Sequence, residues 1–304
     1  MKKFFNLRNT IVITICLAGL TIFSGCDKES NPNAIAITGI NLDVVSHKLF
    51  VGTEYTLTAT VTPTNATDKN VTWTSNNENV ATVVNGIVTA KTVGTATITA
   101  KAGNQTATCA ITVGLVPADG VLINGVVWAT SNVDAPGTFA ATPQSTGMLY
   151  QWNRMKAYPG TGKISESQWD NTWPVGANTW EKANDPSPAG WRICTYEEQR
   201  TLLNTDKVSA VWTTISGIKG TTFTDKTSGN FIFLPAVGYR TSGMVYNDPG
   251  SLVDVEVGHY WNGTKAASYE QYLTSFLMFY SASPFFSSVG LRCALSIRSV
   301  AEID

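Results

Sequence analysis

The sequence DPSPAGWRICT at residues 185–195 decides the architecture of the second half of the chain. Two prolines and a glycine exclude regular structure on its N-terminal side. Thr195 and Glu198 then form a capping box, in which the threonine hydroxyl accepts a backbone N–H and the glutamate reaches back to the start of the helix. The box predicts a short helix that continues through Leu202 and Leu203.

Two side chains of the same stretch are expected to fix it in a core. Trp191 is large and apolar and stands just before the helix, so it should anchor the turn. Cys194 lies at the same corner, and its only plausible partner in this half of the chain is Cys293. The sequence therefore predicts a Cys194–Cys293 disulfide, which an oxidising exterior would permit.

Length and composition limit the classes of function. The chain has 304 residues, which is enough for two domains of ordinary size. Its formal net charge is −1 and only 14% of its residues are charged, which argues against a nucleic-acid partner. Gly, Ser, Thr, Asn and Val are abundant and long Leu, Ala, Glu or Lys runs are missing, so strands and turns are favoured over helices.

The N-terminus reads as a lipoprotein signal at residues 1–25. Positive charges precede an apolar run at residues 11–23 that is too short for a comfortable membrane span. The run ends in Ser24 and Gly25 before Cys26, which resembles the lipobox of bacterial lipoproteins. This resemblance implies cleavage before Cys26 and acylation of its thiol, so that lipid holds the protein to a membrane.

The residues after the lipobox suggest where the protein goes. The acid-bearing sequence DKE at residues 27–29 resembles the surface-export signals of Bacteroidetes lipoproteins. Residues 26–34 are a polar tether. We therefore expect a lipid-anchored protein of the outer membrane that is exposed at the cell surface.

Residues 35–113 have the period-two pattern of strands. In residues 55–61, Tyr55, Leu57, Ala59 and Val61 fall on one face. Several short alternating segments separated by turn residues predict a β-sandwich. Asn85-Gly86 is a strong hairpin signal, and Cys109 alternates with Ile111 and Val113, so it reads as a small buried hydrophobe.

The order of motifs in this segment resembles the bacterial Ig-like group 2 domain. The motifs are VTWTS at 71–75, VATV at 80–83, GIVTA at 86–90 and GTATITA at 94–100. The resemblance implies an all-β Ig-like sandwich with Trp73 in its core. Such domains usually serve as spacers or adhesin modules.

A linker at residues 114–119 leads to a second domain at residues 120–304. Its apolar segments include residues 231–235, 272–280 and 289–297, and residues 253–257 alternate Val with acid, so all are expected to be strands. Residues 159–188 lack periodicity and read as a long irregular loop. That loop contains three tryptophans, Trp169, Trp173 and Trp180.

Six motifs of this domain resemble the Fibrobacter succinogenes major paralogous domain. The signature DPxPxGWRxxT at residues 185–195 is accompanied by INGVVW at 123–128, YQW at 150–152, LPAVGYR at 234–240, YW at 260–261 and GLRC at 290–293. The family usually has Cys where this chain has Ser187, and Pro where it has Cys194. The resemblance implies an α+β C-type-lectin-like fold.

The chemistry of known lectin-like sites is only partly present. The acidic proline loop of calcium-dependent sugar binding is missing, so no metal and no cofactor are expected. Asp254 and Glu256 project from one predicted strand face near His259, a pair that could act as general acid and base on a sugar. A solvated strand face explains the same pattern, and no nucleophile elbow is present. We therefore do not expect this chain to be an enzyme.

The remaining candidate is a binding surface. Trp169, Trp173 and Trp180 are candidate ligand contacts if they are exposed, because tryptophan stacks on sugar rings and anchors protein partners. The alternative is that they form the core of their own loop. We expect an Ig-like spacer that presents a lectin-like domain to a glycan or protein ligand, in adhesion or ligand capture. A structural component of a fimbria-like surface assembly is the alternative, and a carbohydrate-active enzyme is the third.

Overall fold

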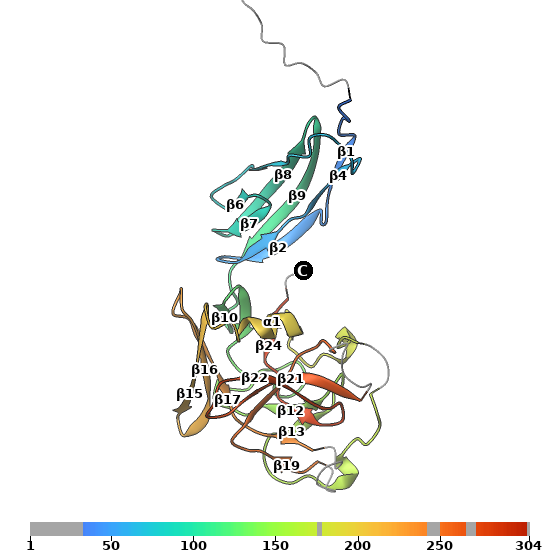
Figure 1. Cartoon of the computed structure of the whole chain (residues 1–304). Helices are drawn as coiled ribbons and strands as arrows, with labels where there is room; N and C mark the ends of the chain where they lie inside the picture. The colour runs from blue at the N-terminus through green and yellow to red at the C-terminus, as the bar shows by residue number, and fades with distance from the viewer. Residues whose placement is uncertain (1–32, 175–177, 242–249, 266–271, 303–304) are drawn as a thin grey trace, which may run out of the picture.

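The chain is built from two units of β-strands that follow each other along one long axis (Figure 1). This computed structural model describes residues 33–174, 178–241, 250–265 and 272–302. Strands β1–β9 form the first unit, and β10–β24 with one α-helix form the second. No helix within those ranges is long and apolar enough to cross a membrane.

The first unit packs two main sheets against each other. One sheet has the strand order β2-β9-β8-β5, the other β3-β7-β6, and β1 pairs with β4 beside them. Most neighbours are antiparallel, whereas β2 and β9 run parallel. The strands are β1 (Gly39–Leu42), β2 (Ser46–Phe50), β3 (Glu54–Thr56), β4 (Ala59–Thr62), β5 (Thr72–Ser75), β6 (Ala81–Val84), β7 (Ile87–Ala90), β8 (Gly94–Ala102) and β9 (Gln105–Gly114).

Period-two alternation produces the core of this unit. In β9, Cys109, Ile111 and Val113 are buried in one cluster while the residues between them are exposed. Burial raises the pKa of the Cys109 thiol, so the residue behaves as the predicted small hydrophobe. Trp73 packs against this cluster and is partly buried.

The predicted hairpin turn is also confirmed. Asn85 and Gly86 join β6 to β7 with φ values of 50° and 84°, the left-handed conformation that a two-residue type I′ turn requires. A Cβ on Gly86 would lie 2.7 Å from the backbone oxygen of Leu57, so only glycine fits there.

In the part of the second unit that the structure describes, the strands form four small antiparallel sheets. Their strand orders are β10-β11-β24-β14, β13-β12-β23-β18-β19, β15-β16-β17 and β20-β21-β22. The strands are β10 (Gly120–Ile123), β11 (Val126–Ala129), β12 (Met148–Gln151), β13 (Ala157–Pro159), β14 (Trp191–Ile193), β15 (Val208–Ile215), β16 (Ile218–Asp225), β17 (Phe231–Pro235), β18 (Tyr239–Arg240), β19 (Leu252–Val253), β20 (Gly258–Trp261), β21 (Leu273–Phe279), β22 (Phe285–Gly290), β23 (Ala294–Leu295) and β24 (Ser299–Ala301).

Helical structure in this unit is scarce. Among the described residues it consists of α1 (Tyr196–Thr201) and two 3-10 turns, η1 (Glu166–Gln168) and η2 (Lys182–Asn184). The α+β class expected for the second domain is therefore not supported, since the described chain is almost entirely β. The Thr-, Ser- and Gly-rich composition explains this, because it favours strands and turns throughout.

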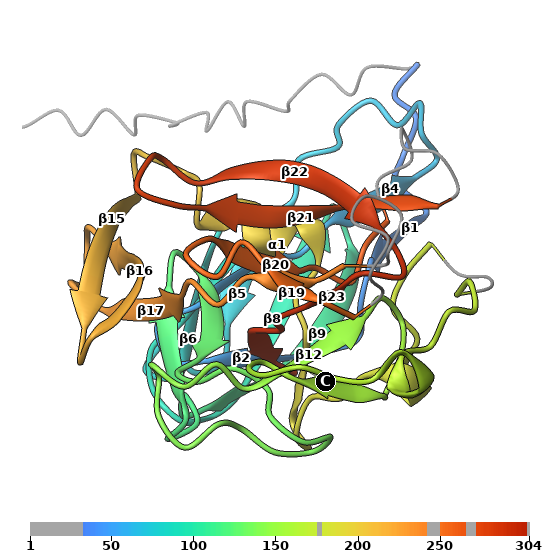
Figure 2. The same ribbon diagram turned by 90° about the horizontal axis from the view of Figure 1, so that it is seen from below.

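The stretch at residues 185–195 folds as predicted at its C-terminal end. Thr195 Oγ1 accepts from the backbone N–H of Glu198 at 3.1 Å, and Glu198 Oε2 accepts from that of Thr195 at 2.7 Å. Helix α1 begins there and covers one side of the β20-β21-β22 sheet, with the Tyr196 ring 4.6 Å from that of Phe286 (Figure 2). Trp191 is buried in β14, as predicted.

One predicted strand is replaced by a turn. Only Leu252–Val253 pairs as a strand, and Asp254 takes a left-handed conformation with a φ of 51°. Val255 is exposed as a result. The alternation of Val and acid in residues 253–257 was misleading, because period two alone does not supply a partner strand.

A buried arginine joins the sheets of the second unit. Arg298 lies just before β24 and donates to the backbone oxygens of Ala129, Thr130 and Phe233 and to Asn132 Oδ1, at 2.6–3.1 Å. Burial lowers its pKa to about 10. The four oxygen acceptors are all neutral, and they replace the hydrogen bonds to water that the guanidinium loses on burial.

The two units also share a small apolar contact. Phe50 at the end of β2 packs in one cluster with Val127, Ala129, Trp191 and Ala301 of the second unit. The linker between β9 and β10 is short, residues 115–119, and it lies beside this contact.

Candidate functional site

Two of the three candidate tryptophans belong to the core. Trp169 is 5% exposed, and its ring lies 4.5 Å from that of Tyr158. Trp180 is 8% exposed, meets Trp152 edge-on at 5.8 Å, and donates from Nε1 to the backbone oxygen of Asn184 at 2.7 Å. The irregular loop folds back onto its own aromatic residues, so neither ring is an exposed stacking surface.

Trp173 is the candidate that reaches the surface. Its half-buried ring lies 4.5 Å from the ring of Tyr272, at an angle of 45°. The guanidinium of Arg292 lies over the Trp173 ring, 4.2 Å from its centroid. Tyr272 is 44% exposed. We call these three side chains the aromatic–arginine cluster.

The loop beneath the cluster is fixed by hydrogen bonds. Arg292 donates to the backbone oxygen of Asn171 at 2.8 Å. Arg154 donates to the backbone oxygen of Thr172 at 2.9 Å and forms an ion pair with Asp170. Burial favours protonation of Asp170, but hydrogen bonds from Thr172 and the charge of Arg154 together keep its pKa below the ordinary value. Residues 170–172 are therefore anchored by two arginine side chains while the aromatic edge stays accessible.

Two members of this cluster, Tyr272 and Arg292, could not be recognised as site residues in the sequence. Tyr272 was expected only as the beginning of a strand and Arg292 only as part of a family motif. Nothing in the local sequence pairs either residue with Trp173, because the contact depends on how the β21–β22 hairpin meets a distant loop. The one feature that the two residues share in the sequence is their position: Tyr272 directly precedes β21, and Arg292 lies just after β22.

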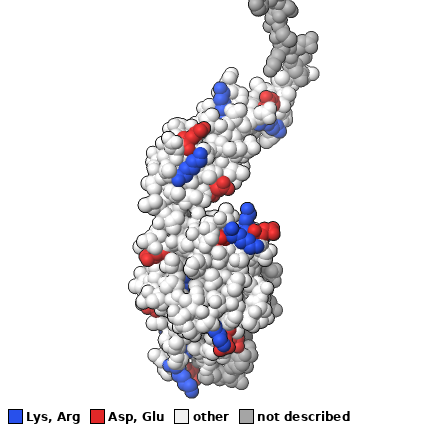
Figure 3. All heavy atoms as spheres, turned by 90° about the vertical axis from the view of Figure 1, so that its left-hand side faces the viewer, with Lys and Arg blue, Asp and Glu red and all other residues white. Residues whose placement is uncertain are grey.

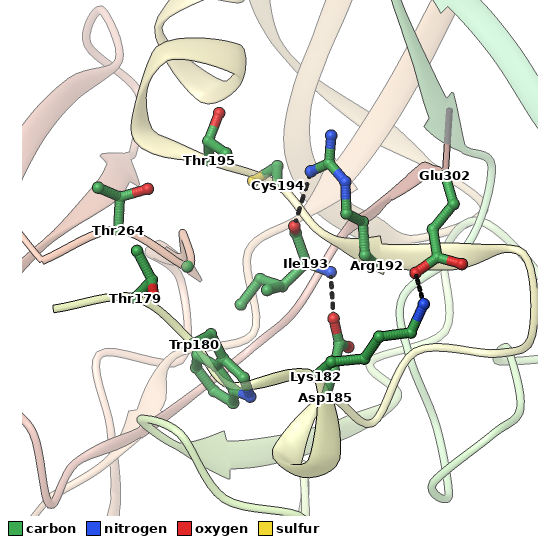
Figure 4. Close-up of a pocket in the computed structure, with 11 residues that line it drawn as sticks. Thr179, Trp180, Lys182, Asp185, Arg192, Ile193, Cys194, Thr195, Thr264 and Glu302 are labelled. Atoms are coloured by element: carbon green, nitrogen blue, oxygen red, sulfur yellow. Dashed lines mark hydrogen bonds and ion pairs between the residues drawn. The ribbon is translucent and has the colours of Figure 1, made fainter. Parts of the chain in front are cut away.

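A pocket of about 200 Å³ lies where the 185–195 stretch meets Trp180 (Figure 4). Its charged side chains are already paired. Lys182 lies 2.9 Å from Glu302, and Arg192 donates to both carboxylate oxygens of Glu198 at 2.6 and 2.8 Å. Asp185 accepts from the backbone N–H of Ile193 at 2.8 Å. The pocket therefore offers a charged ligand no unsatisfied partner among these groups.

The predicted disulfide is not formed. Cys194 is buried, and its Sγ lies 3.8 Å from the backbone oxygen of Trp261, to which it donates. β14 pairs with β24, which sets Ile193 opposite Ser299, whereas Cys293 precedes β23 in another sheet. Both cysteines are buried thiols, and they stand beside strands of different sheets. Burial raises the pKa of the Cys194 thiol well above its ordinary value.

The acid–base candidates do not assemble into a site. Glu256 is exposed and pairs with Lys219 at 2.6 Å. Asp254 Oδ2 lies 4.0 Å from His259 Nε2, beyond hydrogen-bond distance. The His259 ring is buried between Tyr239 and Phe276. Within the described ranges, no three His, Cys, Asp or Glu side chains gather as metal ligands would.

Acid should weaken the fold through His259. Burial lowers the pKa of His259 to about 4, although a contact of Nδ1 with the backbone oxygen of Val257 opposes this. The unfolded chain, with a His pKa near 6.5, therefore takes the proton first as the pH falls from 6.5 towards 4. The contribution of His259 to the free energy of unfolding is fully present above pH 6.5 and is lost across that window. The loss is about 2 kcal/mol at pH 5.

Urea unfolding at pH 7 and pH 5 measures this loss. His259→Phe keeps an aromatic ring but cannot titrate, so its free energy of unfolding should fall by about 2 kcal/mol less than that of the parent chain. Equal losses in the two proteins would show that His259 does not carry the effect.

Comparison with known proteins identifies the first unit. Residues 36–113 match the bacterial Ig-like domain (group 2) family. An Ig-like virion protein of Serratia phage KSP90 is 45% identical over 83 residues, which are 26% of this chain and 32% of that protein. The kappa-carrageenase of Pseudoalteromonas carrageenovora is 44% identical over 79 residues, 25% of this chain and 20% of the enzyme.

Other similarities are equally partial. The alpha-L-arabinofuranosidase of Bifidobacterium longum subsp. longum is 48% identical over 84 residues, 27% of this chain and 8% of the enzyme. The chain spans about a third or less of the length of the curated relatives it matches. Among solved structures, domains 4 and 5 of the S-layer protein SbsC give a TM-score of 0.24 at 24% identity, over 26% of this chain and 52% of that one.

Proposed function

We propose that the bacterial Ig-like domain at residues 36–113 is the spacer of a surface-associated protein whose second unit binds a glycan or protein ligand. Matches to this domain are found in a phage virion protein and in two enzymes whose names place their activity on carbohydrates. A segment shared by proteins of such different function is a module that presents another part of the chain. The ligand-binding role therefore falls to the second unit.

The observation that carries this proposal is the aromatic–arginine cluster. A glycan ring presents an apolar C–H face, and an exposed tyrosine or tryptophan offers a flat apolar surface for it. Tyr272 supplies the exposed ring, Trp173 supports it, and Arg292 adds donors for hydroxyl or carboxylate groups. Because residues 170–172 beneath the cluster are anchored by arginine hydrogen bonds, ordering them on binding would cost little conformational entropy.

We further propose membership of the Fibrobacter succinogenes major paralogous family for residues 120–304. The six ordered motifs support it, and the structure buries the tryptophans in four of them, Trp128, Trp152, Trp191 and Trp261. Buried aromatic residues at motif positions are what a shared core would require.

We also propose a lipid anchor at Cys26 and a location at the outer membrane. The apolar run that ends in Gly25-Cys26 supports this, and these residues lie outside the described part of the structure. An anchored N-terminus followed by a spacer would hold the second unit away from the membrane.

The ligand proposal predicts selective loss of binding. A glycan array probed with residues 27–304 should show bound sugars, and Trp173→Ala or Tyr272→Ala should weaken that binding about fivefold, the equivalent of about 1 kcal/mol of stacking. Tyr272→Phe is the matched control, because it keeps the ring and should keep the affinity within about twofold. Chelator should leave binding unchanged, since no calcium loop was found in the sequence.

Two outcomes would overturn the proposal. One is an affinity that neither alanine variant changes, and the other is a melting temperature that falls as much in Trp173→Ala as in a variant of a buried tryptophan.

A further inference from the structure

β15 is the free edge of the three-stranded sheet β15-β16-β17. It pairs with β16 on one side through all eight of its residues. Figures 1 and 2 both place this hairpin at the lateral periphery of the second unit. Its other side therefore faces outward.

The turn between β15 and β16 decides which backbone groups point outward. Ser216 and Gly217 have φ values of 51° and 81°, as in a two-residue type I′ turn that joins Ile215 and Ile218 by a hydrogen bond. Hydrogen-bonded and non-hydrogen-bonded pairs alternate along an antiparallel ladder. The N–H and C=O groups of Ala210, Trp212 and Thr214 consequently point away from β16: these three residues are the open edge.

The open edge has no partner within the described chain. No hydrogen bond from another described element reaches the backbone of Ala210, Trp212 or Thr214. Such a row of unpaired donors and acceptors is a template for another strand.

β15 also lacks the usual protection of an edge strand. Its sequence, VSAVWTTI, contains no charged residue, proline or glycine. The molecular face on this side is mostly uncharged, apart from isolated side chains and one group of both signs just below the first unit (Figure 3). On the sheet face that turns away from the core, Val211 is 56% and Phe231 is 57% exposed. An uncharged edge beside exposed apolar side chains suits a protein contact.

We propose that the open edge pairs with the open edge of a second copy of this chain, antiparallel about a two-fold axis at Trp212. Ala210 then faces Thr214 of the other copy, Trp212 faces its counterpart, and Thr214 faces Ala210. Each of these pairs exchanges two backbone hydrogen bonds. The two three-stranded sheets become one continuous sheet.

A second copy fits this edge because the edge is self-complementary. A two-fold axis places the same strand on both sides, so any charge at a central position would meet itself; β15 has none. The small Ala210 side chain opposite the branched Thr214 leaves room for the two central tryptophans. This inference is independent of ligand binding at the aromatic–arginine cluster, which involves other elements.

The test measures association of residues 27–304, which include every described residue. Sedimentation velocity across a concentration series should show a reversible monomer–dimer equilibrium. Thr214→Pro removes an outward N–H without touching the β16 ladder, and it should raise the dimer dissociation constant at least tenfold. Thr214→Ala is the matched control, because it keeps the N–H and should dimerise like the parent chain.

A charge exchange tests the register without proline. Ala210 and Thr214 are both exposed, so charged side chains there should leave the monomer folded. Ala210→Lys with Thr214→Lys sets like charges opposite each other and should abolish the dimer. Ala210→Lys with Thr214→Glu sets opposite charges together and should preserve it. The proposal is overturned if the chain stays monomeric at millimolar concentration. It is also overturned if neither double variant changes the dimer dissociation constant.

Discussion

Trp128→Ala should lower the free energy of unfolding by about 3–5 kcal/mol, the usual cost of deleting a large buried aromatic side chain. Trp128 is 1% exposed and packs in the largest cluster of the second unit. Its strand β11 pairs with β10 on one side and with β24 on the other. Removing the indole would therefore leave a cavity between two sheets that cannot easily close.

Urea denaturation followed by circular dichroism would measure this effect. Trp173→Ala is the control, since it removes the same side chain from a half-buried surface position and should cost about 1 kcal/mol or less. If the two variants were equally destabilised, the contrast between core and surface tryptophans would be wrong.

Cys26→Ala should abolish acylation altogether. The side chain is the only acceptor for lipid at the predicted cleavage point, so the protein would be released or would accumulate as a precursor. Incorporation of labelled fatty acid and partition into detergent phase measure the change in the native host.

A second cysteine provides a matched control for that experiment. Cys16 lies inside the predicted leader, and Cys16→Ala should leave acylation and partition as in the parent chain. Wild-type lipid labelling of Cys26→Ala would contradict the anchor.

Local features were predicted well from the sequence. The Thr195–Glu198 box and the Asn85-Gly86 turn depend on residues only one to three positions apart, so their geometry is set by neighbours. The alternation in β9 gave its buried face directly. These features need no knowledge of how distant strands pair.

Features that depend on distant pairing were not predictable. The expected Cys194–Cys293 disulfide is not formed, because bonding of two distant thiols depends on how their strands are placed in space, and no local signal specifies that placement. Trp169, Trp173 and Trp180 look alike in one irregular loop, yet only Trp173 faces solvent with Tyr272 and Arg292 beside it. Burial in a loop follows from what packs onto it, which composition does not reveal.

The placement of β23 and β24 has a consequence for biogenesis. β24 lies between β11 and β14, and β23 lies between β12 and β18. Residues 294–301 thus fill the middle of two sheets whose other strands are synthesised much earlier. The Ig-like domain can fold as soon as it emerges, but the second unit must wait, with its aromatic core uncovered, until residue 301 has left the ribosome. While it waits, this unit exposes apolar surface that a chaperone could cover.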